Sequence, residues 1–192
     1  MSDYKDLLGI ISVLFVIATV IPYYRGMYRG ETKPHVFTWL IWTLTCGITG
    51  LAMFADGGGP GAWAMTLAGL INAITALLAL KCGEKNITRA DWVMLTLGLC
   101  AIPLWWFTKD PLWSVILLTA IDTTGYVPTF RKSWMKPKEE VALTYFLGGI
   151  WQVVSLFALT NYSLTTMLAP ISYTIINATL IAFLLIRRKS LA

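Results

Sequence analysis

The sequence predicts an all-α transmembrane protein with seven helices. Of its 192 residues, 57% are hydrophobic and 13% are charged, and the mean hydropathy is +0.67, which leaves too little polar material to cover a soluble domain of this size. Its apolar runs approach the roughly 20 residues that a helix needs to cross a bilayer. Backbone polar groups must be paired in hydrocarbon, so these runs are expected to be helices. The predicted spans are 7–24, 36–55, 61–80, 91–107, 112–130, 141–160 and 164–186.

The cations segregate to one side of these spans. Only Lys5 and Lys109 fall on the other side, whereas 13 of the 15 Lys and Arg residues lie in the remaining loops and the C-terminal tail. The positive-inside rule then places the N-terminus outside and the C-terminus in the cytoplasm, in a plasma membrane or bacterial inner membrane. The position of the charges thus points to a lipid bilayer as partner and not to nucleic acid. The 13 residues are Arg25, Arg29, Lys33, Lys81, Lys85, Arg89, Arg131, Lys132, Lys136, Lys138, Arg187, Arg188 and Lys189.

Spans 1 to 3 repeat in spans 5 to 7. Sliding the chain by 106 residues superposes Pro22 on Pro128, and an Asn follows 50 and 49 residues later, as Asn72 and Asn177. Three spans are an odd number, so the single span 4 between them restores the same orientation and the repeats are expected to be parallel. Such pairs place a substrate site near the bilayer midplane between the repeats. The predicted units are 1–85 (first three-helix repeat), 86–110 (linker helix) and 111–192 (second three-helix repeat).

These features resemble the PQ-loop superfamily and, within it, the sugar-transporting SWEET proteins with their 3+1+3 spans. The resemblance covers the architecture of nearly the whole chain, whereas the pair that names the family reads Pro22-Tyr23 and Pro128-Thr129 here. Prolines that SWEET proteins carry within spans 2 and 6 are missing, since Pro34 only opens span 2. The resemblance implies a transporter in which the two Asn residues and tryptophans of spans 2 and 6 surround the substrate.

Each candidate substrate-binding residue has two possible roles, one structural and one in binding a substrate. Asn72 and Asn177 lie near mid-span, where an amide needs partners. They either bond one helix to another, at about 1 kcal/mol each, or hold the polar groups of a substrate. Inner aromatics likewise either stack on a substrate ring or fill the core. The candidates in spans 2 and 6 are Trp39, Trp42, Trp151 and Gln152.

Asp122 is the only acid deep within a predicted span. Intramembrane acids are costly and are therefore functional candidates. The position that matches it in the first half is Val16, so the halves are chemically unequal. Asp122 is either a proton-coupling group or a structural acid bonded to Thr123 and Thr124.

Pro22 and Pro128 are hinge candidates, because a proline within a helix removes a hydrogen bond and kinks the chain. A static bend is the alternative for both. His35 opens span 2 at the inner interface, where a solvated or capping role is expected over a proton relay.

The sequence predicts a transporter of a small neutral polar solute that works by alternating access. A receptor or sorting protein on the same scaffold is the first alternative, and a lipid-acting enzyme using Asp122 and His35 is the second. Motifs of hydrolases and nucleotide-binding enzymes are missing, and the three widely spaced cysteines suggest neither a disulfide nor a metal site. No catalytic residue, cofactor or metal is expected. Glycines that allow close helix approach, and with it a homo-oligomer, are Gly47, Gly50, Gly148 and Gly149.

Overall fold

The computed structural model is all-helical in the part of the chain that it describes. The described residues are 3–30, 34, 36–83, 89–126, 130, 133–134, 137 and 142–190. The helices are α1 (Asp3–Tyr28), α2 (Val36–Ala55), the 3₁₀ turn η1 (Gly59–Ala62), α3 (Trp63–Cys82), α4 (Arg89–Leu99), α5 (Ala101–Thr108), α6 (Pro111–Gly125), α8 (Ala142–Ala158) and α9 (Leu164–Ser190).

Four helices are long and apolar enough to cross a membrane, judged by length and composition. They are Tyr4–Tyr28, Val36–Ala55, Gly59–Cys82 and Leu164–Ser190. Three shorter apolar helices correspond to predicted spans 4, 5 and 6, at Trp92–Thr108, Pro111–Thr124 and Tyr145–Ala158. The structure therefore confirms an all-helical chain with several helices of membrane-spanning length, which is compatible with an integral membrane protein.

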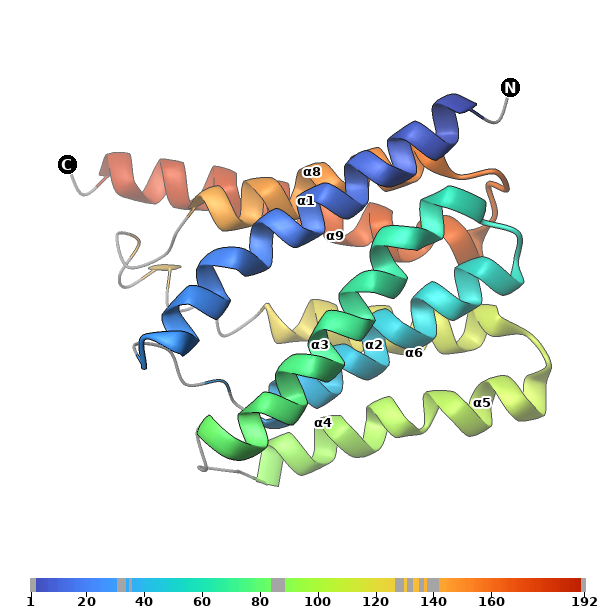
Figure 1. The fold of residues 1–192 in the computed structure, drawn as a ribbon, viewed down its shortest axis with the longest axis horizontal. Coiled ribbons are helices and arrows are strands. Elements are labelled where there is room, and N and C mark those ends of the chain that lie inside the picture. Colours follow the sequence, from blue (N-terminus) through green and yellow to red (C-terminus); the bar gives the residue numbers. More distant parts are fainter. Residues whose placement is uncertain are drawn as a thin grey trace.

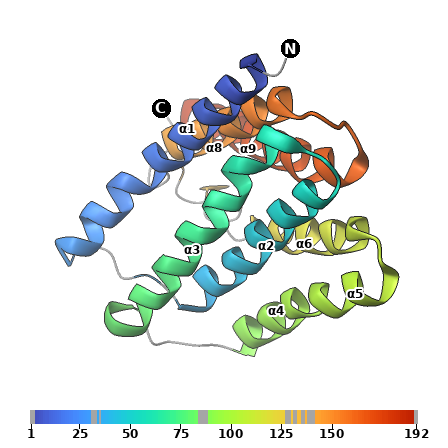
Figure 2. The same cartoon turned by 45° about the vertical axis from the view of Figure 1, so that its right-hand side comes forward.

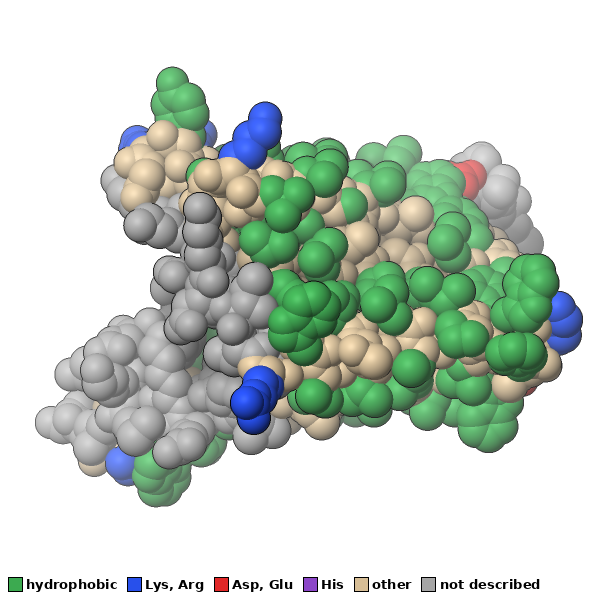
Figure 3. Space-filling view, turned by 90° about the horizontal axis from the view of Figure 1, so that it is seen from below, with side chains coloured by type: hydrophobic (Ala, Val, Ile, Leu, Met, Phe, Trp, Pro, Cys, Tyr) green, Lys and Arg blue, Asp and Glu red, His purple; other side chains and the backbone are tan. Residues whose placement is uncertain are grey.

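Large apolar side chains cover much of the outer surface. Leu77, Leu80 and Phe107 are 66%, 64% and 81% exposed. Figure 3 shows apolar side chains spread over the face that is seen from below, and the few charged side chains visible there lie toward its ends. Water would penalise so much exposed apolar area, whereas lipid chains would not. The surface thus fits a chain that is surrounded by lipid.

The helices lie alongside one another, so the molecule has two ends (Figure 1). One end carries the N-terminus and the turns that join α2 to η1, α5 to α6 and α8 to α9; it is named the Asp56 end here. The C-terminus lies at the opposite end of the molecule.

Each helix packs on specific neighbours. In one group α3 lies between α1 and α2, and in a second group α9 lies between α6 and α8. The main contacts between the groups are α1 on α8 and α2 on α6, and smaller ones join α8 to η1, α2 to α9 and α3 to α8. In Figures 1 and 2, α4 and α5 lie outside this arrangement, on the side of α2 and α6 away from α1. Six helices therefore enclose a common interior.

Local sequence features set the start of α6, the end of α5 and the division between α4 and α5. The Asp110 side chain accepts a hydrogen bond from the Leu112 amide at 2.9 Å, and Pro111 takes the first helical position of α6, as is typical of a helix start. Lys109 ends α5 with φ 56°. Predicted span 4 is divided into α4 and α5 at Cys100, next to Pro103, which lacks the amide hydrogen of a regular helix.

Candidate functional site

A group of polar side chains lies inside the helix bundle where α6 meets α9. The Tyr173 hydroxyl donates to Oδ2 of Asp122 at 2.6 Å. One turn along α9, Asn177 donates from Nδ2 to the carbonyl of Tyr173 at 2.8 Å, and its Oδ1 accepts a long bond of 3.4 Å from the Tyr126 hydroxyl. We name these four residues, Asp122, Tyr126, Tyr173 and Asn177, the Asp122 cluster.

Asn72 reaches toward this cluster from α3. Its Nδ2 donates to the carbonyl of Trp42 in α2 at 3.2 Å, and the thiol of Cys46, one turn further along α2, lies beside Asn72 and near Asp122. Asn72 and Asn177 are both buried, at 8% and 4% exposure. Polar groups thus extend from α3 through α2 and α6 to α9, and Asp122 lies in their middle.

Several buried polar atoms near Asp122 have no hydrogen-bond partner among the described residues. They include Oδ1 of Asp122 and the hydroxyls of Thr49 and Thr119. Thr45 lies beside the Asp122 carboxyl group, but its hydroxyl donates to the Trp42 carbonyl at 3.4 Å. The helices α2 and α6 run antiparallel (Figure 1), so the next turn brings Thr49 to the level of Thr119.

Unpaired polar atoms are uncommon in protein interiors, because each costs about 1–3 kcal/mol. The strip of Thr45, Thr49, Thr119 and Asp122 between α2 and α6 therefore holds unused hydrogen-bonding capacity. A small polar molecule could form hydrogen bonds with these side chains, and the Asp122 carboxyl group could take up a proton. The strip lies where the two groups of helices meet.

Gly148 leaves space beside Asn177. A Cβ atom added at Gly148 of α8 would lie 3.6 Å from both Nδ2 and Oδ1 of the Asn177 amide. Gln152 follows one turn later on the same face of α8. It is 3% exposed and its Oε1 has no partner in the described part of the chain. Both amides predicted in the second half thus lie in the interior.

The predicted tryptophans occupy different surroundings. Trp39 is 7% exposed; its Nε1 donates to the Tyr23 hydroxyl at 3.2 Å, and the two rings are 4.9 Å apart. Trp151 packs against two buried clusters of apolar residues. Trp42 is 42% exposed, so it offers its backbone carbonyl and not its ring to the polar groups.

The hinge and relay candidates are described only in part. Pro22 lies within α1, which continues from Asp3 to Tyr28. Pro128 and His35 lie outside the described residues. Their predicted roles stay predictions.

A second polar region closes the Asp56 end. The Ser163 hydroxyl donates to Oδ2 of Asp56, and Nδ2 of Asn161 donates to the Asp56 carbonyl at 2.7 Å. The Thr160 amide donates to the Gly58 carbonyl at 3.1 Å, and its hydroxyl donates to the Gly57 carbonyl. These bonds join the turn after α2 to the loop between α8 and α9, and we name them the Asp56 seam.

Glycines allow this close approach. Gly57 and Gly59 have φ of 72° and 59°, a region that residues with a side chain rarely adopt. A Cβ atom at Gly61 would come within 2.5 Å of the Leu159 side chain. The seam is therefore tightly packed as well as hydrogen-bonded.

Tyr173, Tyr126, Thr45 and Thr49 were not among the candidates that the sequence suggested. The side-chain partners of the two tyrosines lie on other helices, 51 residues away in each case. Only the spacing of polar residues within apolar helices could have indicated them.

The chain matches no family model, no curated protein and no solved structure.

Proposed function

We propose that the chain is a membrane transporter of a small neutral polar solute, which it binds at the Asp122 cluster. The observation that carries the proposal is the set of unpaired buried polar atoms at the contact between the two groups of helices. A bundle that served only as a scaffold would gain stability by replacing these groups with apolar ones. Amide, hydroxyl and carboxyl groups together can donate to and accept from the hydroxyls of a solute.

The order in which helices pack supports two parallel three-helix repeats joined by the α4–α5 linker. In each group the third helix lies between the first two: α3 between α1 and α2, and α9 between α6 and α8. The contact of α1 with α8 corresponds to that of α6 with α2. This order fits the 106-residue shift and the proposed likeness to SWEET proteins.

We propose alternating access on the basis of this arrangement. The Asp56 seam holds the two groups together at one end, and the Asp122 cluster lies between that end and the other. Rocking of the groups about the cluster would break the seam and open the Asp56 end. Asp122, with one oxygen bonded and the other without a partner among the described residues, is the residue through which a proton could enter this cycle.

Uptake into liposomes tests the proposal. Purified protein is reconstituted, and entry of radiolabelled sugars, polyols and neutral amino acids is compared with protein-free liposomes, with and without an imposed pH gradient. We expect saturable uptake of one of these classes. Ligand-dependent thermal stabilisation without uptake would replace the transporter by a receptor, and turnover of a lipid without a gradient would replace it by an enzyme.

Topology is tested separately. We propose that the Asp56 end faces outside, because 13 of 15 cations lie on the other side of the predicted spans. A reporter fused after Ala192 is expected to be cytoplasmic, and a tag inserted between Asp56 and Pro60 is expected to be accessible from outside. Accessibility of both from the same face contradicts the seven-span topology.

A further inference from the structure

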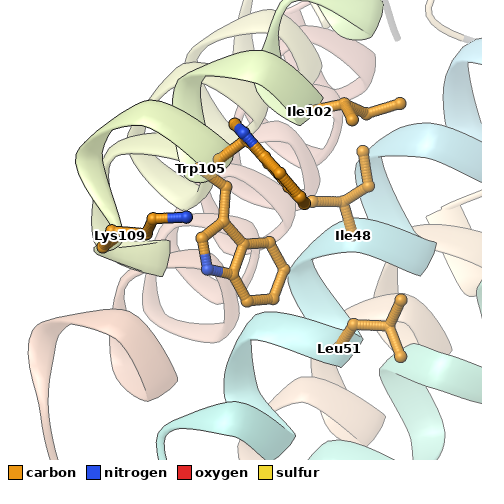
Figure 4. A pocket seen from close by; sticks show the side chains of 6 residues that line it. Ile48, Leu51, Ile102, Trp105 and Lys109 are labelled. Carbon is orange, nitrogen blue, oxygen red and sulfur yellow. The ribbon is translucent and has the colours of Figure 1, made fainter.

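An open apolar groove lies on the surface between α2 and α5. Its volume is about 500 Å³, within the range of sites that hold small ligands. Figure 4 shows the groove between the two helices, with Lys109 at its edge. The lining residues are Ile48, Leu51, Ile102, Trp105, Trp106 and Lys109.

The groove exists because the linker leaves α2 as it runs toward the Asp56 end. Its first part, α4, packs on α2, whereas its second part, α5, packs on α6. Ile48, Leu51 and Ile102 therefore face a gap that is open to the surroundings of the bundle. Their neighbours Phe107 and Leu99 are exposed on the same linker.

In a bilayer this gap must be filled by something apolar. Water is excluded from the hydrocarbon region, and an empty gap would forfeit the dispersion contacts of every side chain that lines it. A lipid acyl chain is flexible and present at high concentration there. The apolar lining thus selects an acyl chain as the part of the ligand inside the groove.

The cation at the end of the groove selects the rest of the ligand. Lys109 ends α5 and is exposed, and its Nζ lies 4.6 Å from the centre of the Trp106 ring. The neighbouring carboxylate of Asp110 is used as the cap of α6, and no ion pair of Lys109 is present among the described residues. Tryptophan and lysine together are typical of the level of lipid headgroups.

We propose that this groove binds an anionic phospholipid, with one acyl chain against Ile48, Leu51 and Ile102 and the phosphate headgroup at Lys109. The site joins α2 of the first group to the α5 part of the linker. It is separate from the Asp122 cluster, and its occupancy does not depend on transport.

Native mass spectrometry of the whole chain in detergent tests the site with phosphatidylglycerol and phosphatidylcholine of identical acyl chains. We expect wild-type protein to retain phosphatidylglycerol roughly fivefold more than phosphatidylcholine, the factor that corresponds to about 1 kcal/mol for one surface lysine. Lys109→Gln should reduce this ratio to near one. Ile102→Trp, at a position that is 53% exposed, should fill the groove and reduce retention of both lipids.

Lys5→Gln is the control, because Lys5 lies near the start of α1 and donates to the Leu159 carbonyl, and α1 lies on the opposite side of the bundle from α5 (Figures 1 and 2). Its substitution should leave the lipid ratio unchanged. An unchanged ratio in Lys109→Gln, or unchanged retention in Ile102→Trp, overturns the proposal. A dimer that Ile102→Trp dissociates would show that a second copy of the chain, and not a lipid, fills the groove.

Discussion

Asp56 and Asp122 show two opposite ways of holding an acid in this bundle. Asp56 lies at one end, where its carboxylate and its carbonyl both accept bonds from the loop between α8 and α9. Asp122 lies in the interior, where one oxygen accepts from Tyr173 and the other has no partner among the described residues. The first arrangement closes two groups of helices on each other. The second leaves one oxygen of a buried group available, and in the proposed transporter this difference separates a gate from a binding site.

The largest effect is expected for Asp122→Asn. An amide has nearly the same shape and can still accept from Tyr173, so solute binding should persist. An amide cannot carry a proton, so acceleration of uptake by an imposed pH gradient should fall to background. Uptake with and without the gradient, and solute-dependent thermal stabilisation in detergent, measure the two effects.

Asp110→Asn is the control for this experiment. Asp110 caps α6, and Asn caps helices about as well as Asp does, so neither quantity should change. Loss of binding in Asp122→Asn would indicate direct contact with the solute. Unchanged gradient dependence would return Asp122 to a structural role.

A smaller effect is expected for Tyr173→Phe. The variant removes the donor to Asp122 and leaves a buried carboxyl group without its bond, which should lower the free energy of unfolding by about 1–3 kcal/mol. Tyr126→Phe removes a bond of 3.4 Å to Asn177 and should cost less, because long bonds are weak. Thermal unfolding of both variants in detergent gives the comparison. Equal losses of unfolding free energy would mean that the Asp122–Tyr173 bond stabilises the fold no more than the Tyr126–Asn177 bond does.

The all-helical fold and the buried amides could be predicted from the sequence for one reason. Both depend on the hydrophobicity of single segments, since an apolar run of sufficient length must form a helix and a lone Asn or Asp within it is conspicuous. Asp122, Asn72, Asn177 and Gln152 were found in this way, and the structure buries both Asn residues and Gln152.

Pairing between helices could not be predicted in the same way. Tyr173 meets Asp122 only because α9 packs on α6, and no local pattern encodes that contact. Trp42 illustrates the reverse error. Its position well inside a helix suggested an inner ring, but the side chain is 42% exposed, because depth along a helix does not determine which face a residue occupies.

Opening of the Asp56 seam should be detectable at Cys46. In a Cys82→Ser, Cys100→Ser background Cys46 is the remaining thiol, and it lies beside Asn72 in the interior. A membrane-impermeant thiol reagent added from outside should label it slowly. Asp56→Ala removes the acceptor of Ser163 and should raise the labelling rate about fivefold, as the loss of roughly 1 kcal/mol from one hydrogen bond predicts.

Asp6→Asn is the control for the labelling experiment, since Asp6 lies near the start of α1 at the same end. It should leave the rate unchanged. Equal rates in wild type and Asp56→Ala would show that the seam does not control access to the interior.

The smallest effect is expected for Gly148→Ala, which tests whether the space beside Asn177 belongs to the solute. The added methyl group would lie 3.6 Å from the amide atoms of Asn177, an ordinary contact, so the protein should fold. It would occupy part of the space through which a solute reaches that amide. Binding of the transported solute should therefore weaken about two- to fivefold, which is less than the change in affinity that one methylene group causes in a tight pocket.

Gly47→Ala is the matched control, because a Cβ atom there has no neighbour within 4 Å. Both variants gain the same helix propensity, so the difference between their solute affinities isolates crowding at Asn177. Identical affinities would mean that the solute binds elsewhere and that Asn177 only joins α9 to Tyr126.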